Sequence, residues 1–491
     1  MRGHPFCPHL LEPMAYPKKL AGRFIFIDAR YYTYVMFNGW THPWRAIRSI
    51  GYPAFIYPFL YSERDNFHKI IMSERSNGAD IWKGPEEPIY AMVSESGMVE
   101  RFEAIAFAQR VILSFAAAVF YLSLCRWFTP IFSFFALCVA LWLAPLPNPQ
   151  FIMTEPLSCA LTWLCAAFLL YAPISTKKSM YYVLACFCAA FAFLVRPQNL
   201  SLTGLCSLIF LYEVIFSGRH HFFVTLLKRA VIFSPLLLAY GYIAWICLTG
   251  GGIYLHTLAE VYYTAFCAYA ETEDVPYMPI ERSRKFTSWF GEHKEKLISK
   301  IKANGVRFPE KASPPRIRQI MGDGLLYCGG MSEAWVHFSK EKGLAHLSRQ
   351  QHAVFGKELN AGLKKRHARE ILTNHWENFL GGLGYYKDIY RLAHLSNVTF
   401  LINMVALSLS LAGIILVTRI RWPVSIMAAI HLMALFAAAL GHFVIGRYVE
   451  PTEPLLLLAG LGSSWALCGC LIGQLKKHAV ESSPSDPTSV F

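Results

Sequence analysis

Charged residues are scarce in this chain of 491 residues. Asp, Glu, Lys and Arg together make up 16% of the chain, whereas 55% of the residues are hydrophobic. A buried helix in a soluble core explains one short apolar run, but it does not explain a long series of them in a chain with so little charge. The shortage of charge therefore argues against a soluble globular protein.

The sequence also lacks an internal repeat, a low-complexity tract and any cysteine or histidine spacing typical of a metal site. Thirteen cysteines are present, and ten of them fall in or beside apolar stretches. Cysteine acts there as a small hydrophobic residue. Only Cys7, Cys267 and Cys328 lie elsewhere. One disulfide fits this arrangement, but none is required.

A secretory leader is a further feature that the N-terminal residues lack. Met1 to Lys19 contain neither a charged leader nor an apolar core of adequate length. A translocated N-terminal region of about a hundred residues normally follows a signal peptide or a first membrane helix. We therefore expect an additional membrane helix upstream of Met1, which would leave both termini in the cytoplasm.

What the chain does contain is a series of nine strongly apolar stretches, each a candidate membrane helix. Several are shorter than the roughly 20 residues that a helix needs to cross about 30 Å of hydrocarbon. The stretches cover residues 104–124, 131–146, 156–171, 180–195, 200–216, 231–249, 398–417, 422–445 and 454–472.

Positive charge falls in every second gap between these stretches. One set of gaps carries ten basic residues and no acidic residue, whereas the other set of short gaps carries two arginines. The positive-inside rule places the first set in the cytoplasm. The predicted fold class is therefore an all-α polytopic membrane protein, a transmembrane helix bundle with an external, mostly helical insert.

The expected organisation has five parts. Residues 1–103 form an external N-terminal region with the first catalytic loop, and 104–249 form membrane helices one to six. Residues 250–397 form the external insert, in which 288–303 and 350–372 have helical periodicity. Residues 398–472 form membrane helices seven to nine, and 473–491 form a cytoplasmic tail.

The net charge of +14 does not indicate nucleic-acid binding. Ten of the basic residues are explained by topology, and many others lie in the insert. On an external domain, basic runs fit anionic lipid headgroups or a phosphate-bearing substrate, and a simple solvated helix face is the alternative.

Asp28 is the first polar residue that suggests chemistry. It follows the apolar strip Ile-Phe-Ile and precedes Arg30, Tyr31 and Tyr32. A carboxylate at a membrane surface suits a general base, because partial burial raises its pKa and a nearby arginine lowers it. A helix cap or a structural ion pair is the alternative. We take Asp28 as the candidate base, and Arg30, Tyr31 and Tyr32 as candidate substrate-binding residues.

Three more candidates fall at predicted helix ends. Thr154-Glu155-Pro156 predicts a helix start, where the helix dipole favours the Glu155 carboxylate. Arg196 and Arg447 lie in external loops, and an arginine can bind a phosphate through two parallel hydrogen bonds. A snorkelling membrane anchor is the alternative for each arginine. The topology gathers Asp28, Glu155, Arg196 and Arg447 on one outer face, which suits an anionic, lipid-linked phosphosugar.

The order of these motifs resembles the GT-C superfamily of integral membrane glycosyltransferases. The motifs are the acidic residue with aromatic followers, Gly-Tyr-Pro at 51–53, Thr-Glu-Pro at 154–156, Arg-Pro-Gln at 196–198 and Arg-Tyr at 447–448. The chain is most similar to bacterial members related to the protein O-mannosyltransferases and the lipid A aminoarabinose transferases. The similarity covers residues 24–216 and 389–471.

The resemblance implies an enzyme of the bacterial inner membrane, with its active site facing the periplasm or the cell exterior. The enzyme would pass a sugar from a polyprenyl-phosphate donor to a lipid, glycan or protein acceptor. Asp28 would be the catalytic base, Arg196 and Arg447 would contact the donor phosphate, and Glu155 would join the substrate-binding residues. In-line displacement predicts inversion at the sugar. A divalent metal at the phosphate stays open, because no ligand cluster stands out.

Two other functions fit parts of the sequence. A flippase or transporter of lipid-linked sugars would place charges within its membrane helices and usually show an internal repeat. A structural or assembly component with a large external domain would not require the outer arginines. In the enzyme, we expect the insert to select the acceptor.

Overall fold

The computed structural model describes residues 50–61, 99–143, 154–196, 199–215, 222–249, 270–303, 338, 349–383, 393–440 and 452–481. These residues are almost all helical, and no strand occurs among them. The helices are α2 Gly51–Leu60, α5 Val99–Leu124, α6 Pro130–Leu143, α7 Thr154–Tyr171, α8 Lys178–Val195, α9 Leu200–Ile215, α10 Phe222–Ile232, α11 Ser234–Thr249, α13 Glu281–Ala303, α16 Arg349–Gly382, α17 Ala393–Leu416, α18 Arg421–Leu440 and α20 Glu453–Glu481, with 3-10 turns η5 Ala172–Ile174, η9 Thr272–Tyr277 and η11 Thr418–Ile420.

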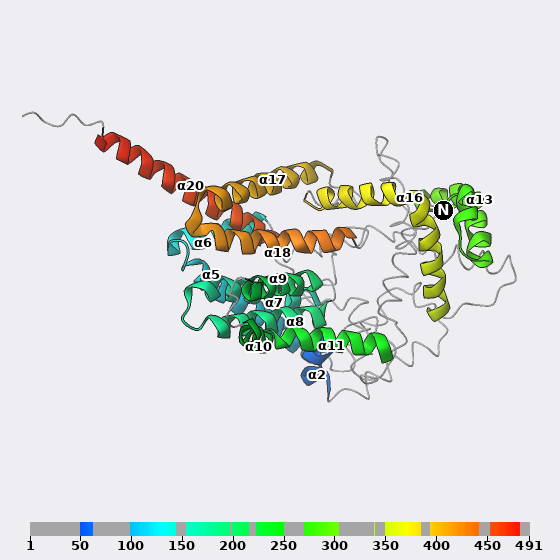
Figure 1. The fold of residues 1–491 in the computed structure, drawn as a ribbon, viewed down its shortest axis with the longest axis horizontal. Helices are drawn as coiled ribbons and strands as arrows, with labels where there is room; N and C mark the ends of the chain where they lie inside the picture. The colour runs from blue at the N-terminus through cyan, green and yellow to red at the C-terminus, as the bar shows by residue number, and fades with distance from the viewer. Residues whose placement is uncertain are drawn as a thin grey trace, which may run out of the picture.

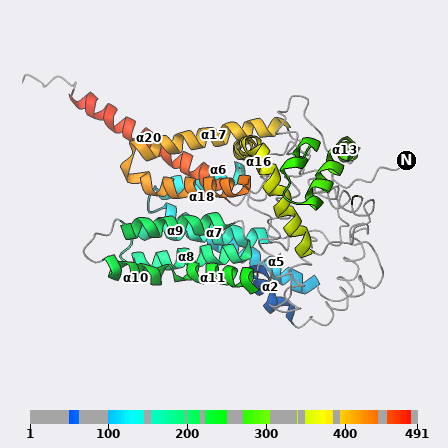
Figure 2. The same ribbon diagram turned by 45° about the vertical axis from the view of Figure 1, so that its right-hand side comes forward.

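The apolar helices lie side by side, and the insert helices α13 and α16 lie at one end of them (Figure 1 and Figure 2). Two shorter apolar helices, α6 and α9, accompany six that are long and apolar enough to cross a membrane. The prediction of an all-α polytopic membrane protein is confirmed. The six long spans are Glu100–Leu124, Thr154–Ile174, Lys178–Val195, Thr399–Leu416, Thr418–Ala439 and Glu453–Leu475.

One expected membrane helix is divided in two. The apolar stretch 231–249 was predicted as a single helix, but α10 ends at Ile232 and α11 begins at Ser234. Pro235 gives the physical reason, because proline has no N–H to donate to the carbonyl group four residues earlier and its ring clashes with that carbonyl. The other eight stretches each fall on one helix, and their ends differ by up to nine residues, at the end of α20.

Helix α7 lies at the centre of the bundle. In the most apolar 18-residue part of its span Thr154–Ile174, 78% of the residues are buried inside the protein. The corresponding share is 22% for the span Thr399–Leu416 of α17. Trp163 of α7 and Phe120 of α5 are both fully buried, with ring centroids 5.0 Å apart. Most of the α17 side chains instead face outward, where lipid tails would surround the protein.

Two tryptophans satisfy the last carbonyl groups of α7 at the end away from the insert. Nε1 of Trp127 donates to the carbonyl oxygen of Leu170 at 3.2 Å, and Nε1 of Trp422 donates to that of Leu169 at 2.9 Å. The last four carbonyls of a helix have no partner within the helix, and an unpaired group is costly in hydrocarbon. The two indoles therefore tie the segment before α6 and the start of α18 to the central helix.

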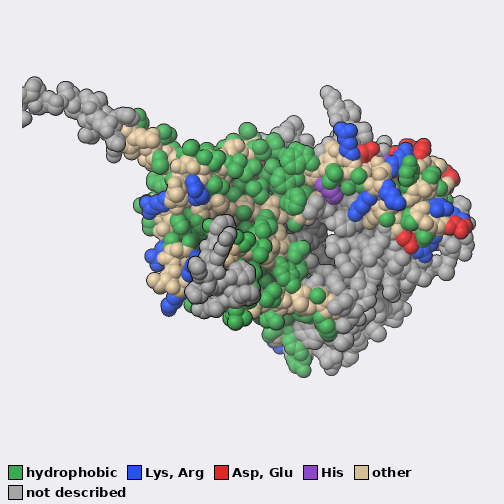
Figure 3. Space-filling model, in the orientation of Figure 1, with side chains coloured by type: hydrophobic (Ala, Val, Ile, Leu, Met, Phe, Trp, Pro, Cys, Tyr) green, Lys and Arg blue, Asp and Glu red, His purple; other side chains and the backbone are tan. Residues whose placement is uncertain are grey.

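The same end carries a cluster of charge around Glu213 of α9. Lys178 and Arg229 each lie 2.8 Å from one of its carboxylate oxygens, and the Tyr182 hydroxyl donates to it at 3.3 Å. Figure 3 shows Lys and Arg side chains gathered at this end, the distribution from which the cytoplasmic loops were predicted. Glu213 joins α8, α9 and α10, a role hidden by its place inside an apolar stretch.

Helix α2 packs against the end of α8 so closely that Gly51 has no room for a side chain. A Cβ atom there would lie 2.5 Å from the backbone carbon of Leu194 and 2.6 Å from the nitrogen of Val195. The next residue, Tyr52, is fully buried, and its hydroxyl donates to Oε1 of Gln109 at 2.8 Å. The Gly-Tyr-Pro sequence thus holds α2 between α5 and the residues that precede Arg196.

We expect Gly51→Ala to lower the melting temperature of the detergent-solubilised protein by several degrees. The methyl group meets backbone atoms that cannot rotate away, and such overpacking costs about 1–3 kcal/mol. Gly241→Ala in α11 is the matched control, because nothing lies within 4 Å of a Cβ at that position. Equal melting temperatures for the two variants would contradict the close packing of α2.

Candidate functional site

The predicted helix start at Thr154 is confirmed, and it positions Glu155. Helix α7 begins at Thr154, with Glu155 in its first turn and Pro156 next. The Thr154 hydroxyl donates to Oε2 of Glu155 at 3.2 Å. A carboxylate in the first helical turn also interacts favourably with the helix dipole. Glu155 is only 6% exposed, so its carboxylate depends on neighbouring groups, and not on water, for hydrogen bonds.

Arg196 reaches Glu155 from the C-terminal end of the neighbouring helix α8. It follows the last residue of α8 in an extended conformation, and its Nη1 lies 3.4 Å from Oε1 of Glu155. Arg196 is 7% exposed. The structure thus brings together two of the candidates, 41 residues apart in sequence. The Glu155 carboxylate beside it orients the guanidinium.

A cavity opens beside Arg196, between α7 and the start of α9 on one side and α18 on the other. Asn199 helps to shape the first side, because its Nδ2 donates to Oγ of Ser158 and to the carbonyl oxygen of Ala192, both at 2.8 Å. The polar lining consists of Ser158, Thr162, Arg196, Asn199, Ser201 and Thr452. Leu202 and three residues of α18, Ile430, Ala434 and Ala438, supply the apolar lining.

Thr452 belongs to a second copy of the α7 start. The sequence Thr-Glu-Pro-Leu occurs at 154–157 and again at 452–455, and the second copy begins α20. Thr452 and Glu453 are 5% and 4% exposed. Two helix starts of identical sequence therefore contribute to the surroundings of one cavity. The repeated tetrapeptide is a signal that sequence analysis could have used and did not.

Two side chains hold the start of α20. Nδ1 of His431 lies 3.1 Å from the Thr452 hydroxyl, and Nδ2 of Asn403 donates to Oε1 of Glu453 at 3.0 Å. His431 lies nine residues before Leu440, the last residue of α18, so α20 begins beside α18 about 14 Å along its axis from that end. Among the described residues, Nε2 of His431 and Oδ1 of Asn403 have no hydrogen-bond partner.

The remaining predicted site residues lie outside the described residues. These are Asp28, Arg30, Tyr31, Tyr32 and Arg447. The expected convergence of acidic groups and arginines is therefore tested only for Glu155 and Arg196, which do meet.

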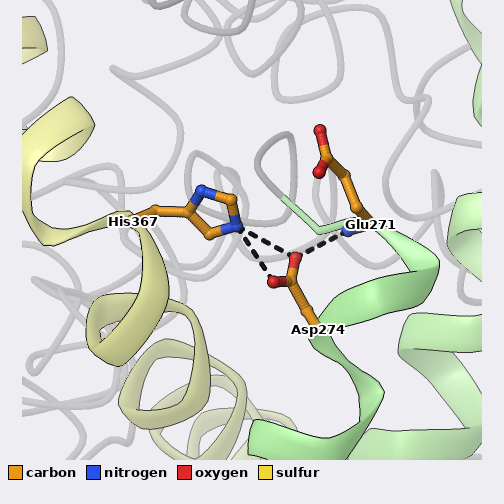
Figure 4. Close-up of side chains that lie close together, drawn as sticks. All are labelled: Glu271, Asp274 and His367. Carbon is orange, nitrogen blue, oxygen red and sulfur yellow. Dashed lines mark hydrogen bonds and ion pairs between the residues drawn. The ribbon is translucent and has the colours of Figure 1, made fainter.

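A separate cluster lies in the insert, where Glu271, Asp274 and His367 approach one another (Figure 4). Ligand atoms of the three residues lie within 4.8 Å of one another, close enough to hold a metal ion. Asp274 is fully buried, however, and its carboxylate accepts hydrogen bonds from Nε2 of His367, the backbone N–H of Glu271 and the Arg366 guanidinium. The Arg366 charge disfavours a second cation there, and the cluster instead joins η9 to α16.

Comparisons of this chain with protein-family models, with curated proteins and with solved structures find no match. Function is therefore inferred from the site itself.

We expect Arg196→Gln to destabilise the protein by about 3–5 kcal/mol, because it removes the positive charge that lies beside the buried Glu155 carboxylate. The double variant Glu155→Gln/Arg196→Gln should recover most of that loss, since two neutral amides remove the uncompensated charge. Thermal unfolding in detergent measures both. A double variant as unstable as the sum of the two single variants would contradict the pairing.

The Asp274 cluster predicts a pH dependence for the docking of η9 on α16. Burial alone would raise the pKa of Asp274, but hydrogen bonds from His367 and the Glu271 N–H, with the charges of His367 and Arg366, hold it below its usual value. The ionised carboxylate therefore stabilises the fold above the unfolded pKa of about 3.9, and this contribution is lost as the pH falls through the folded value.

Asp274→Asn should consequently speed hydrogen exchange in η9 and α16 at pH 7, and the difference from the unsubstituted protein should shrink below about pH 4. Glu273→Gln is the control. The Glu273 carboxylate is 67% exposed and lies 4.0 Å from Nη1 of Arg366, farther than the 3.1 Å between that atom and Asp274. A difference for Asp274→Asn that persists unchanged in acid would show that charge is not the cause.

Proposed function

We propose that this integral membrane protein is a glycosyltransferase that takes its sugar from a polyprenyl-phosphate donor. The observation that carries the proposal is the buried Arg196–Glu155 pair beside a cavity lined with hydroxyl and amide groups. The lining combines one guanidinium, several neutral donors and an apolar wall, which are the groups that contact a phosphate and its hydrocarbon chain.

Arg196 is suited to a leaving group that gains negative charge. A guanidinium has five N–H donors in a planar fork, the geometry that matches the oxygen atoms of a phosphate. When the bond between the anomeric carbon and the phosphate oxygen breaks, the phosphate leaves as an anion. A fixed cation that stabilises this charge lowers the barrier without an acid catalyst.

The acceptor needs a base, and Asp28 is the candidate from the sequence. Its carboxylate would take the proton from the acceptor hydroxyl as the oxygen attacks the anomeric carbon from the face opposite the phosphate. That displacement inverts the configuration of the sugar. Arg447 would be a second contact to the donor phosphate, while Arg30, Tyr31 and Tyr32 would bind substrate near the base.

The position of the cavity in the bundle indicates on which side of the membrane the reaction takes place. The cavity lies toward the insert end of the bundle, whereas Lys and Arg gather around Glu213 at the other end. If the basic end faces the cytoplasm, the reaction takes place on the non-cytoplasmic side. In a bacterial cell this would be the periplasmic or exterior face of the inner membrane, where a lipid, glycan or protein acceptor is accessible.

The test is sugar transfer by the purified protein in liposomes, with polyprenyl-phosphate mannose and polyprenyl-phosphate aminoarabinose as donors. Asp28→Asn should reduce turnover by about 10²–10⁴-fold, the usual contribution of a general base. Arg196→Lys keeps the charge but loses the planar fork, so its turnover should fall and its KM for the donor should rise.

Glu281→Gln is the control for this assay, because Glu281 pairs with Lys285 on the exposed face of α13. The turnover of this variant should not change. Full turnover by Asp28→Asn would remove the proposed base. Movement of the donor across the liposome membrane without any transfer would favour a flippase instead.

A further inference from the structure

Helix α16 consists of two segments that meet at His367. This residue has φ −103° and ψ 17° inside an otherwise helical run, and Figure 1 shows the two segments at a wide angle. At the bend, Nε2 of His367 lies 3.0 Å from Oδ2 of the buried Asp274. The second segment, residues 368–382, therefore leaves the insert in a fixed direction, toward the membrane helices.

The end of this segment reaches the level of the membrane spans. The carbonyl oxygen of Leu383 accepts a hydrogen bond from Nδ2 of Asn403 at 2.7 Å, and Asn403 lies inside the apolar span Thr399–Leu416. One side of the segment also docks on α18, because Nδ1 of His375 lies 3.0 Å from the carbonyl oxygen of Ala439. Leu383, Leu435, Ala438 and Ala439 form a small buried cluster there.

Next to this docked face, the segment exposes large apolar side chains. Trp376 stacks on Phe379, which packs against the buried cluster, with ring centroids 5.6 Å apart. Leu372 is 68% exposed and Trp376 is 60% exposed, and their spacing of four residues places them on one stripe. Trp376 lies at most about 10 Å along the helix axis from Leu383. The stripe thus begins close to the edge of the apolar spans, where Trp is enriched in membrane proteins.

The lipid-facing surface of α17 continues toward this stripe. Phe400 and Leu401, near the same end of α17, are 39% and 63% exposed. Phe379 of α16 and Met404 of α17 pack against the shared buried cluster. Arg369 is exposed about one turn before Leu372, the position from which a guanidinium reaches lipid phosphate while the apolar side chains lie deeper.

We propose that the second segment of α16 is an interfacial membrane anchor, with Leu372 and Trp376 inserted among the lipids of the leaflet on the insert side. The bilayer is the occupant of this apolar face, because the same segment is bonded to two membrane spans. The anchor fixes the height of the insert above the cavity, of which Ala438 forms part of the wall. This inference does not depend on the proposed enzymatic activity.

Photocrosslinking tests the anchor directly. The full-length protein carrying Trp376→p-benzoylphenylalanine is reconstituted in vesicles of equal parts phosphatidylethanolamine and phosphatidylglycerol. After irradiation, its mass is measured by intact-protein mass spectrometry. We expect phospholipid adducts at this position. Leu372→p-benzoylphenylalanine gives a second measurement on the same stripe, in case the first variant is poorly produced.

The matched control is Ala361→p-benzoylphenylalanine, an exposed position on the first segment of α16, before the bend. Lipid adducts should form several times more often at 372 and 376 than at 361. Equal frequencies at all three positions, whether high or low, would overturn the proposal, because the stripe would then have no special contact with the bilayer.

Discussion

Helix α7 can lie in the centre of the bundle because side chains from other segments satisfy the polar groups at both of its ends. Two tryptophan indoles donate to the carbonyls of Leu169 and Leu170 at one end. At the other end, Glu155 meets Arg196. In hydrocarbon, each unpaired polar group would cost several kcal/mol. This requirement fixes the segments around α7, and the candidate site inherits their positions.

The charged groups at the two ends of the bundle differ in what they contribute. Glu213 pairs with Lys178, whose side chain is 40% exposed, and with Arg229, at 20%, so this cluster holds helix ends together where water still screens it. The Arg196–Glu155 pair is more than nine-tenths buried. Burying such a pair costs roughly as much as it returns, and apolar residues often replace one without loss of stability. The two clusters therefore differ in setting: water partly screens the first, whereas the second is a buried pair whose net contribution to stability is small.

The sequence predicts the parts of the fold that depend on local pattern. Long apolar runs give the membrane helices, and Thr154-Glu155-Pro156 gives the start of α7, because capping and proline placement are local. A different argument predicted that Arg196 and Glu155 share one face of the bundle: the charge asymmetry of the loops assigned both residues to the outer face. That argument names a face and not a contact. It therefore groups Glu155 with Arg196 without giving the geometry of the pair.

Contacts between distant residues with no periodic pattern were not predicted. Asp274 and His367 lie 93 residues apart, and Asn403 and Glu453 lie 50 apart. No local sequence pattern distinguishes any of these four residues from its neighbours, so only the tertiary packing identifies its partner. The break between α10 and α11 is different, because Pro235 was a local signal outweighed by the hydrophobicity of the run. His431 was missed because a lone histidine on an apolar helix is most often part of the core.

Within the part of the chain that the structure describes, α16 connects the insert to the cavity. The carbonyl of Leu383 accepts a hydrogen bond from Asn403, and the same amide group donates to Glu453 at the start of α20. Thr452, the preceding residue, lines the cavity. A displacement of the second α16 segment would break a bond at a buried amide, and no water is present in hydrocarbon to replace it. If the insert selects the acceptor, it must therefore do so from a position fixed relative to the second Thr-Glu-Pro-Leu start, so acceptor choice and cavity shape would depend on the same few contacts.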